Sequence, residues 1–447
     1  MKIQTRKRIF YVFILLFVVI GAAVVFYAEG WRMNFSTLVA EKAGGIYVHS
    51  FPDNAQISLN NKPVENQSAF LSRGTFISGL FPKTYMLTLA APGYDTWTEN
   101  PVVAPSLVTE MKYAVLVPKM ATNVATSAAA VNNFFEASNN IISTDASGTI
   151  TWLGKIIGYG TVISHSTDLK TAIIRSISTK TGATKFMLYN FVNATGTNLS
   201  PILQQSGILS TPSTNVFVDP YDDTNIITQT SAKIVQIDGE TRRTTAIETA
   251  PAGAVIESPI AVSPSAMAWG RYAHASDTSQ IIIYDKFSGN TIDSSLVVKD
   301  PIKQLAWVNN NVLGILKSDN TLVLYNVPNE TLSTLADDVK QFYPTADGSV
   351  LAALEYHSLE IFSFTTQDYY RFDLPQAADV QGLIWHKDQA HLFVQYPDHV
   401  AFLDFADTNL KNLTIVSAGT DASYDPQKNA LYIIDQGQKL LRFDFPQ

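Results

Sequence analysis

The apolar positions of this 447-residue chain follow two different patterns. Near the N-terminus, Ile9 to Tyr27 (IFYVFILLFVVIGAAVVFY) form an apolar run without a single charge. At a rise of about 1.5 Å per residue, a helix of this length nearly spans a hydrocarbon core of about 30 Å. Beyond residue 44, short runs of alternating apolar and polar residues are separated by Gly, Pro, Asn and Asp, which is typical of strands and turns. The pattern therefore predicts one membrane-length helix followed by an all-β region.

The charges around the apolar run predict how it is oriented. Four cations and no acid lie within the first eight residues, and Glu29 follows the run. Because cations favour the cytoplasmic side, we predict a cytoplasmic tail (1–8), a transmembrane helix (9–27) and an extracytoplasmic remainder. A cleaved signal peptide is the rival, since Gly21 to Ala23 offers small residues, but its apolar region is usually only about 7–15 residues. A buried core helix would leave the basic flank unexplained, so we expect a single-pass signal anchor in the cell membrane.

Residues 44–118 contain five short strand-like runs: 46–50, 55–59, 75–77, 84–90 and 111–117. In the fourth run (TYMLTLA), Tyr85, Leu87 and Leu89 fall on one face, which indicates a half-buried strand. Asn60-Asn61 suits a two-residue hairpin, because Asn tolerates positive φ better than most other residues.

These runs resemble a PEGA domain, a small β-sandwich-like module of envelope-exposed proteins. The resemblance rests on Gly45, on SFPDNA from Ser50, on LFPKTY from Leu80 and on PGY from Pro92. The chain departs from the family at the corner, which has Asp-Asn in place of Glu-Gly, and at Lys83, where Gly is usual. The resemblance implies a structural or binding module. Tyr85, Tyr94 and Trp97 could form a carbohydrate-stacking platform, but aromatic residues at strand spacing in so small a module favour its core.

A second pattern repeats over residues 122–447. A short apolar strand that ends in an aromatic residue or Asp recurs at intervals of about 40 residues, which is the period of a four-stranded β-propeller blade. The copies are ITWLG from 150, FMLYN from 186, KIVQID from 233, IIIYD from 281, LVLYN from 322, LEIFSF from 359, VAFLDF from 400 and LLRFDF from 441. We predict a seven- or eight-bladed propeller. Since no outer strand follows the last copy, we expect closure by a strand from around residues 115–130.

The turns that precede these strands resemble those of WD-like and TolB-type propellers. Tyr343 to Gly348 (YPTADG) is the copy that matches best, and Trp385 to Asp388 and Tyr424 to Pro426 are looser matches. The Gly-His and Trp-Asp signatures of true WD repeats are absent from the sequence. The resemblance supports the fold and does not identify a ligand.

Candidate metal ligands are few. The chain has no cysteine, which excludes disulfides and thiolate sites. His386 and His391 flank a predicted blade turn without a spacing such as His-Glu-x-x-His. His386 takes the place of Val308 and Tyr343 in sister repeats, which favours a turn residue. Asp219 to Asn225 (DPYDDTN) offers hard oxygens for calcium, but the segment lies at a blade turn, where Asp and Asn are common for backbone reasons.

Other chemistry is equally sparse. Ser143 to Trp152 (STDASGTITW) resembles the Asp-box of sialidase propellers, but its spacings are longer and no set of arginines accompanies it, so a hairpin turn with a packing Trp is favoured. There is no phosphate loop and no Gly-x-Ser-x-Gly. A net charge of −8 argues against nucleic acid as a partner. We therefore predict no catalytic residue, no metal site and no cofactor.

Together these patterns predict an all-β extracytoplasmic protein of the cell envelope that is not an enzyme. We expect the propeller to act in binding or scaffolding and to present a surface to a protein, peptide or glycan. The alternative is a propeller hydrolase or lyase that acts on envelope polysaccharide. Because propeller active sites draw residues from several blades, a missing motif counts only weakly against that alternative. A cluster of carboxylates and aromatic residues at one end of the channel would favour it.

Overall fold

The computed structural model describes residues 3–34, 39–68, 73–124, 130–137, 140–299, 301–405 and 412–446. Its backbone contacts define two compact units. The first comprises Met1–Ala121, Phe402–Val416 and Phe443–Gln447, and the second comprises Thr122–Ala401 and Ser417–Arg442.

The apolar run lies on a long N-terminal helix, α1 (Ile3–Ala28). Within the described residues, this is the one helix that is long and apolar enough to cross a membrane, over Ile9–Ala28, and none of that segment is buried against the protein. Its length and composition fit either an anchor or a signal sequence. A hairpin of β1 (Trp31–Asn34) and β2 (Val39–Lys42) follows, in a segment for which no strand was predicted.

Two small sheets make up residues 44–115. One has the order β11-β3-β6, with β11 parallel to β3, and the other has the order β5-β4-β8-β9; β7 and β10 form a short additional pair. The strands are β3 (Gly44–Phe51), β4 (Gln56–Leu59), β5 (Lys62–Val64), β6 (Thr75–Leu80), β7 (Lys83–Thr84), β8 (Leu87–Ala90), β9 (Trp97–Glu99), β10 (Val102–Val103) and β11 (Val108–Val115). Sequence reasoning missed β5, β9 and β10, which are only two or three residues long.

Side chains from both sheets share one core, in which Ile46 of β3 and Leu87 of β8 are fully buried. Tyr85 and Trp97 belong to this core and Tyr94 packs against it, which confirms a packing role and contradicts the stacking platform. Asn60 and Asn61 have φ of 49° and 63° and connect β4 to β5, which confirms the predicted hairpin. Asp53 and Asn54 have no positive φ, so the corner does not use Asn as a left-handed substitute for Gly.

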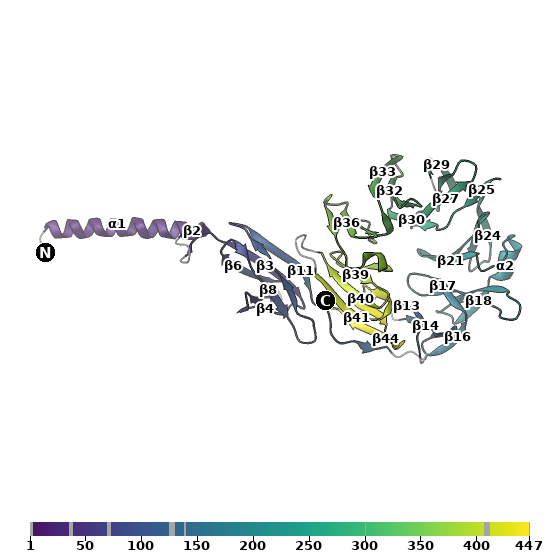
Figure 1. Cartoon of the computed structure of the whole chain (residues 1–447), viewed down its shortest axis with the longest axis horizontal. Helices are drawn as coiled ribbons and strands as arrows, with labels where there is room; N and C mark the ends of the chain where they lie inside the picture. Colours follow the sequence, from purple (N-terminus) through teal and green to yellow (C-terminus); the bar gives the residue numbers. More distant parts are fainter. Residues whose placement is uncertain are drawn as a thin grey trace. The chain divides into compact units, whose positions relative to one another are not determined.

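The rest of the described chain is a β-propeller in which eight sheets succeed one another around a ring (Figure 1). We number the sheets as blades 1–8. Blade 1 comprises β13 (Asn133–Ala137), β14 (Asn140–Thr144), β15 (Thr149–Trp152) and β16 (Lys155–Tyr159), and blade 2 comprises β17 (Thr161–His165), β18 (Thr171–Ile177), β19 (Thr184–Asn190) and β20 (Thr195–Asn198). Blade 3 comprises β21 (Asn215–Asp219), β22 (Asp222–Gln229), β23 (Lys233–Asp238) and β24 (Thr244–Thr249). Blade 4 comprises β25 (Ala254–Ile256), β26 (Ala261–Val262), β27 (Ala266–Ala273), β28 (Thr278–Asp285) and β29 (Asn290–Lys299).

Blades 5–8 continue the same order. Blade 5 comprises β30 (Ile302–Asn309), β31 (Val312–Lys317), β32 (Leu322–Asn326) and β33 (Thr331–Ala336), and blade 6 comprises β34 (Val339–Pro344), β35 (Val350–Glu355), β36 (Leu359–Ser363) and β37 (Tyr369–Phe372). Blade 7 comprises β38 (Gly382–Trp385), β39 (His391–Gln395), β40 (His399–Asp404) and β41 (Asn412–Ala418). Blade 8 comprises β42 (Thr420–Asp425), β43 (Ala430–Ile434) and β44 (Leu440–Asp444), together with β12 (Thr122–Asn123). Each recurring apolar strand of the sequence is the third strand of its blade in the order of the sheet; in blade 4 this is β28, because β25 and β26 both pair with β27.

The ring closes where β12 pairs antiparallel with β44, Thr122 opposite Arg442. This pairing confirms the predicted borrowed strand. First strands of neighbouring blades contact one another, as in β17 with β21 and β30 with β34, so they lie innermost. The apolar clusters each draw on two successive blades; for example, Phe186 of blade 2 packs in one core with Val216 of blade 3. Two short helices, α2 (Ser200–Gln205) and η1 (Ala377–Asp379), interrupt the strands and were not predicted.

Candidate functional site

The turns that join the first and second strands of the blades form a recurring feature, which we call the turn face. In the described residues these turns are Ser166–Lys170, Asp219–Tyr221, Ser263–Ser265, Asn309–Asn311, Thr345–Ser349, His386–Ala390 and Asp425–Asn429. In most of them a side-chain oxygen accepts a hydrogen bond from a backbone amide two residues later. Examples are Asp347 with Ser349 (3.0 Å) and Asp425 with Gln427 (2.9 Å). These bonds fix the turn in place of a backbone partner, so the Asp and Asn residues here have a structural use.

The proposed calcium ligands of Asp219–Asn225 do not converge. Asp219 is buried and pairs with the ammonium of Lys286 (Oδ2–Nζ 2.5 Å). Asp222 instead accepts hydrogen bonds from Thr224 and Asn225. Since these carboxylates already have separate protein partners, the geometry favours the turn interpretation over calcium.

A polar depression of about 340 Å³ opens on the turn face. It is lined by Ser166, Thr167, Asp168 and Lys170 of blade 2, Pro220, Tyr221 and Asp223 of blade 3, and Gln427 of blade 8. The hydroxyl of Thr167 donates to the carbonyl of Pro220 (2.6 Å), which ties two of its walls together. Lys170 and Asp168 form an exposed ion pair (2.6 Å) that raises the pKa of Lys170. The depression therefore contains charges of both signs and an exposed aromatic ring.

An exposed aromatic side chain lines this depression, and another lies next in sequence to a lysine that contacts its ring. Tyr221 is 58% exposed, and the ammonium of Lys286 lies 5.8 Å from its ring centroid. Phe287, which follows Lys286 in the chain, is 84% exposed. Large exposed aromatic side chains beside charged groups are enriched at protein interfaces, where they supply buried area at low entropic cost.

A buried ion cluster joins blade 8 to blade 1. Lys428 pairs with Glu136 of β13 (2.6 Å) and with Asp425 (3.0 Å), and the Glu136 side chain is only 1% exposed. Burial raises the pKa of Glu136 and outweighs the opposing effect of Lys428. Burial alone would lower the pKa of Lys428, but its hydrogen bonds to Glu136 and Asp425 outweigh burial and raise it to about 12.

Two histidines share one carboxylate on the turn between β38 and β39. Nδ1 of His386 lies 2.9 Å from Oδ1 of Asp388, and Nδ1 of His391 lies 2.8 Å from Oδ2. Burial would raise the pKa of Asp388, but the two imidazoles outweigh it and hold this pKa far below its usual range.

The strand register corrects the predicted alignment of this turn. The amide of His386 donates a hydrogen bond to the carbonyl of His391 (3.1 Å). At the corresponding turn of blade 6, the amide of Thr345 donates to the carbonyl of Val350 (2.9 Å). His386 therefore corresponds to Thr345, and its alignment with Tyr343 was wrong because it was shifted by two residues. The spacing His-x-Asp-x-x-His was the signal in the sequence that could have revealed the cluster.

The Asp-box-like segment is a hairpin turn. Asp145 lies between β14 and β15 and accepts hydrogen bonds from the amides of Ser147 (2.9 Å) and Thr149 (2.8 Å). Trp152 is partly buried and packs against Phe191, with ring centroids 5.2 Å apart. Both contacts confirm a turn followed by a packing Trp.

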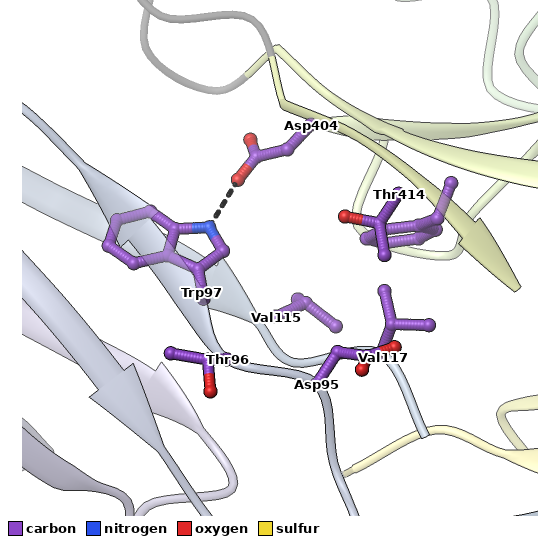
Figure 2. A pocket seen from close by; sticks show the side chains of 8 residues that line it. Asp95, Thr96, Trp97, Val115, Val117, Asp404 and Thr414 are labelled. Carbon is purple, nitrogen blue, oxygen red and sulfur yellow. Dashed lines mark hydrogen bonds between the residues drawn. The ribbon is translucent and has the colours of Figure 1, made fainter. Parts of the chain in front are cut away.

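Within the first unit, the indole N–H of Trp97 donates to Asp404 (2.9 Å), as Figure 2 shows. The space beside this bond, lined by Asp95, Val117 and Thr414 among others, measures only about 10 Å³. A volume of that size holds about one water molecule at most. It is therefore a packing seam and too small for an organic ligand.

Blade 6 contains a pair of buried carboxylates that the sequence did not reveal. Glu355 and Glu360 both pair with Arg371 (3.1 and 3.2 Å). The hydroxyl of Tyr369 donates to Glu360, and that of Ser358 donates to Glu355. Burial, reinforced by the charge of Glu355, raises the pKa of Glu360 against the hydrogen bond from Tyr369. These residues lie on β35, β36 and β37 and away from the innermost strand.

No protein-family model matches the chain, and no curated protein matches it. Solved structures of similar fold include dipeptidyl peptidase 4 from Porphyromonas gingivalis, with 11% identity, coverage of 72% of this chain and 60% of that chain, and a TM-score of 0.50. An oligogalacturonate lyase from Vibrio parahaemolyticus has 11% identity, coverage of 71% and 98%, and a TM-score of 0.47. BamB from Moraxella catarrhalis has 13% identity, coverage of 73% and 100%, and a TM-score of 0.44. At these identities the likeness is one of fold alone.

Proposed function

We propose that this chain is a single-pass envelope protein whose extracytoplasmic propeller binds a protein or peptide and does not act as an enzyme. The observation that carries the proposal is the depression on the turn face, with the exposed Tyr221 in its wall and the exposed Phe287 next to Lys286, which contacts the Tyr221 ring. Its size and its charges of both signs suit the side chains of a peptide segment, and Tyr221 and Phe287 provide the anchoring area that such contacts need.

The membrane placement is part of the same proposal. The exposed apolar segment Ile9–Ala28 and the basic residues before it support an uncleaved anchor with the N-terminus in the cytoplasm. Residues 44–118 would then serve as a PEGA-like stalk. The anchor predicts that the protein stays in the membrane fraction through a carbonate wash. Release into the soluble fraction would contradict it.

Crosslinking in intact membranes followed by pull-down of the full chain tests the binding role. We expect the double variant Y221A/F287A to lose a specific crosslinked protein that the native chain retains. Y159A is the matched control, because Tyr159 is similarly exposed (65%) but lies on the outer strand of blade 1. Equal recovery with all three chains, or recovery of a glycan in place of a protein, would refute the proposed site and partner.

The alternative is a hydrolase or lyase that acts on envelope polysaccharide. The buried pair of Glu355 and Glu360, with the hydroxyl of Tyr369 at Glu360, favours it because burial raises the pKa of Glu360, and a carboxyl group with a raised pKa can act as a general acid beside a second carboxyl group. Release of oligosaccharides from a panel of envelope polysaccharides, lost in E360Q, would support this alternative. Identical product yields from the native chain and E360Q would exclude these residues.

A further inference from the structure

Three side chains that commonly bind metals converge in blade 7. The ligand atoms that His386, Asp388 and His391 offer all lie within 4.8 Å of one another. Both imidazoles are buried, at 3% and 0% exposure, and the Asp388 side chain is 14% exposed. At metal–ligand bonds of about 2.1 Å, donors 2.8–2.9 Å apart subtend an angle of roughly 84–87° at a shared ion. Neighbouring ligands in six-coordinate sites have angles of this size.

Neighbouring groups from blade 8 determine which nitrogen of His386 carries a proton. The hydroxyl of Tyr424 donates to Oδ1 of Asn429 (2.5 Å), so this oxygen acts as an acceptor. Nε2 of His386 lies 2.9 Å from the same oxygen and must therefore donate to it. Metal-binding histidines usually donate their other ring N–H to an oxygen in this way, which fixes the tautomer and the ring orientation.

A cation is needed between His386 and Asp388. When Nε2 carries the proton, Nδ1 of the neutral ring directs a lone pair at a carboxylate oxygen 2.9 Å away, and the two repel. Either a second proton or a metal ion removes that repulsion. The turn itself does not require imidazole, because in blade 6 the hydroxyl of Thr345 donates to Asp347 (2.8 Å) and Val350 takes the place of His391.

We propose that His386, Asp388 and His391 bind one divalent first-row transition-metal ion through both Nδ1 atoms and the carboxylate. Two imidazoles and one carboxylate suit Zn²⁺, Fe²⁺ or Ni²⁺ better than Ca²⁺ or Mg²⁺, which prefer oxygen ligands throughout. The ion would connect the β38–β39 turn to blade 8 through the hydrogen bond from His386 to Asn429.

Zinc binding by the full-length protein in detergent, stripped with a chelator and dialysed, tests this site. We expect about one Zn²⁺ per chain by calorimetry, with a rise in Tm on addition of ZnCl₂. The variant H386T/H391V copies the residues of the blade 6 turn, so it should fold normally and lose at least about tenfold in zinc affinity. H399N is the matched control, because His399 and Asp398 form a His–Asp pair (2.6 Å) that lacks a second imidazole.

Two further measurements keep the outcome interpretable. If H386T/H391V does not fold, D388N replaces it, since Asn retains an oxygen that can accept the amide of Ala390 (3.0 Å) while removing the charge. The absorption spectrum of bound Co²⁺ reports the ligands directly and should change in D388N but not in H399N. The proposal is overturned if the native chain binds no zinc at micromolar concentration, or if H386T/H391V and the native chain bind it equally.

Discussion

Replacing Lys428 with Met tests how far the seam between blades 8 and 1 depends on one buried cation. The Glu136–Lys428 pair has a separation of 2.6 Å and side-chain exposures of 1% and 19%. Removing one member of such a pair leaves an uncompensated buried charge, which costs about 3–5 kcal/mol. Lys170–Asp168 provides an internal control with the same separation of 2.6 Å but exposures of 56% and 39%. Exposed pairs contribute little to stability because solvent screens them, so K170M should be nearly neutral.

The pH dependence follows from the pKa of Glu136, which is raised in the folded state. A raised carboxyl pKa favours folding most at low pH, where Glu136 is protonated, and that contribution is lost as pH rises through the folded pKa. Lys428 opposes this shift, so its removal raises the pKa further. The stability deficit of K428M should therefore be larger at pH 7 than at pH 4.5.

Thermal unfolding of the full chain in detergent, followed by circular dichroism at both pH values, measures these effects. The double variant E136Q/K428M should recover at least about half of the loss, because the buried carboxylate is gone. Equal Tm values for K428M and K170M would refute the reasoning, and so would a K428M deficit that does not change with pH.

Three other predictions concern the backbone. Deleting residues 441–447 removes most of the strand that pairs with β12, so cooperative unfolding of the propeller should be lost; an unchanged melt would argue against closure by that pair. Gly348 and Gly182 have similar φ (+69° and +67°), but a Cβ at Gly348 would lie 2.3 Å from the carbonyl of Val308, whereas nothing lies within 4 Å at Gly182. G348A should thus lower stability by roughly 1–3 kcal/mol more than G182A, and equal Tm values would show that crowding is unimportant there. Replacing Asn61 with Val should cost about 1–2 kcal/mol because of its φ of 63°, whereas N61G should be tolerated, and the melting temperatures of the two variants test this.

The propeller was predictable from the sequence because several of the third strands are buried on both faces and therefore read as continuous apolar runs. LVLYN of β32 is an example, with four of its five residues buried. The borrowed closing strand was predicted on a different ground, because the last copy of the repeat needs an outer partner. The short strands β9 and β10 were missed because two or three residues are too few to show a period.

The candidate sites were harder to predict because they combine residues that are distant in sequence. Tyr221 and Gln427 line one depression, and Glu136 pairs with Lys428, although neither pair shares a motif. The histidine cluster lies within a single turn, but its significance depends on Asn429 of the next blade. Only the spatial order of the blades brings these groups together.

Closure by β12 and β44 also sets an order of events during synthesis. Thr122 is synthesised before blade 1, whereas its partner Arg442 lies in the last strand of blade 8. Until then, blades 1 and 8 lack their final neighbour, and the apolar residues Phe134 and Tyr432, which pack together at that seam, remain open to water. The last blade to be translated thus completes the ring, and the ring stays incomplete for most of the time that the chain is being made.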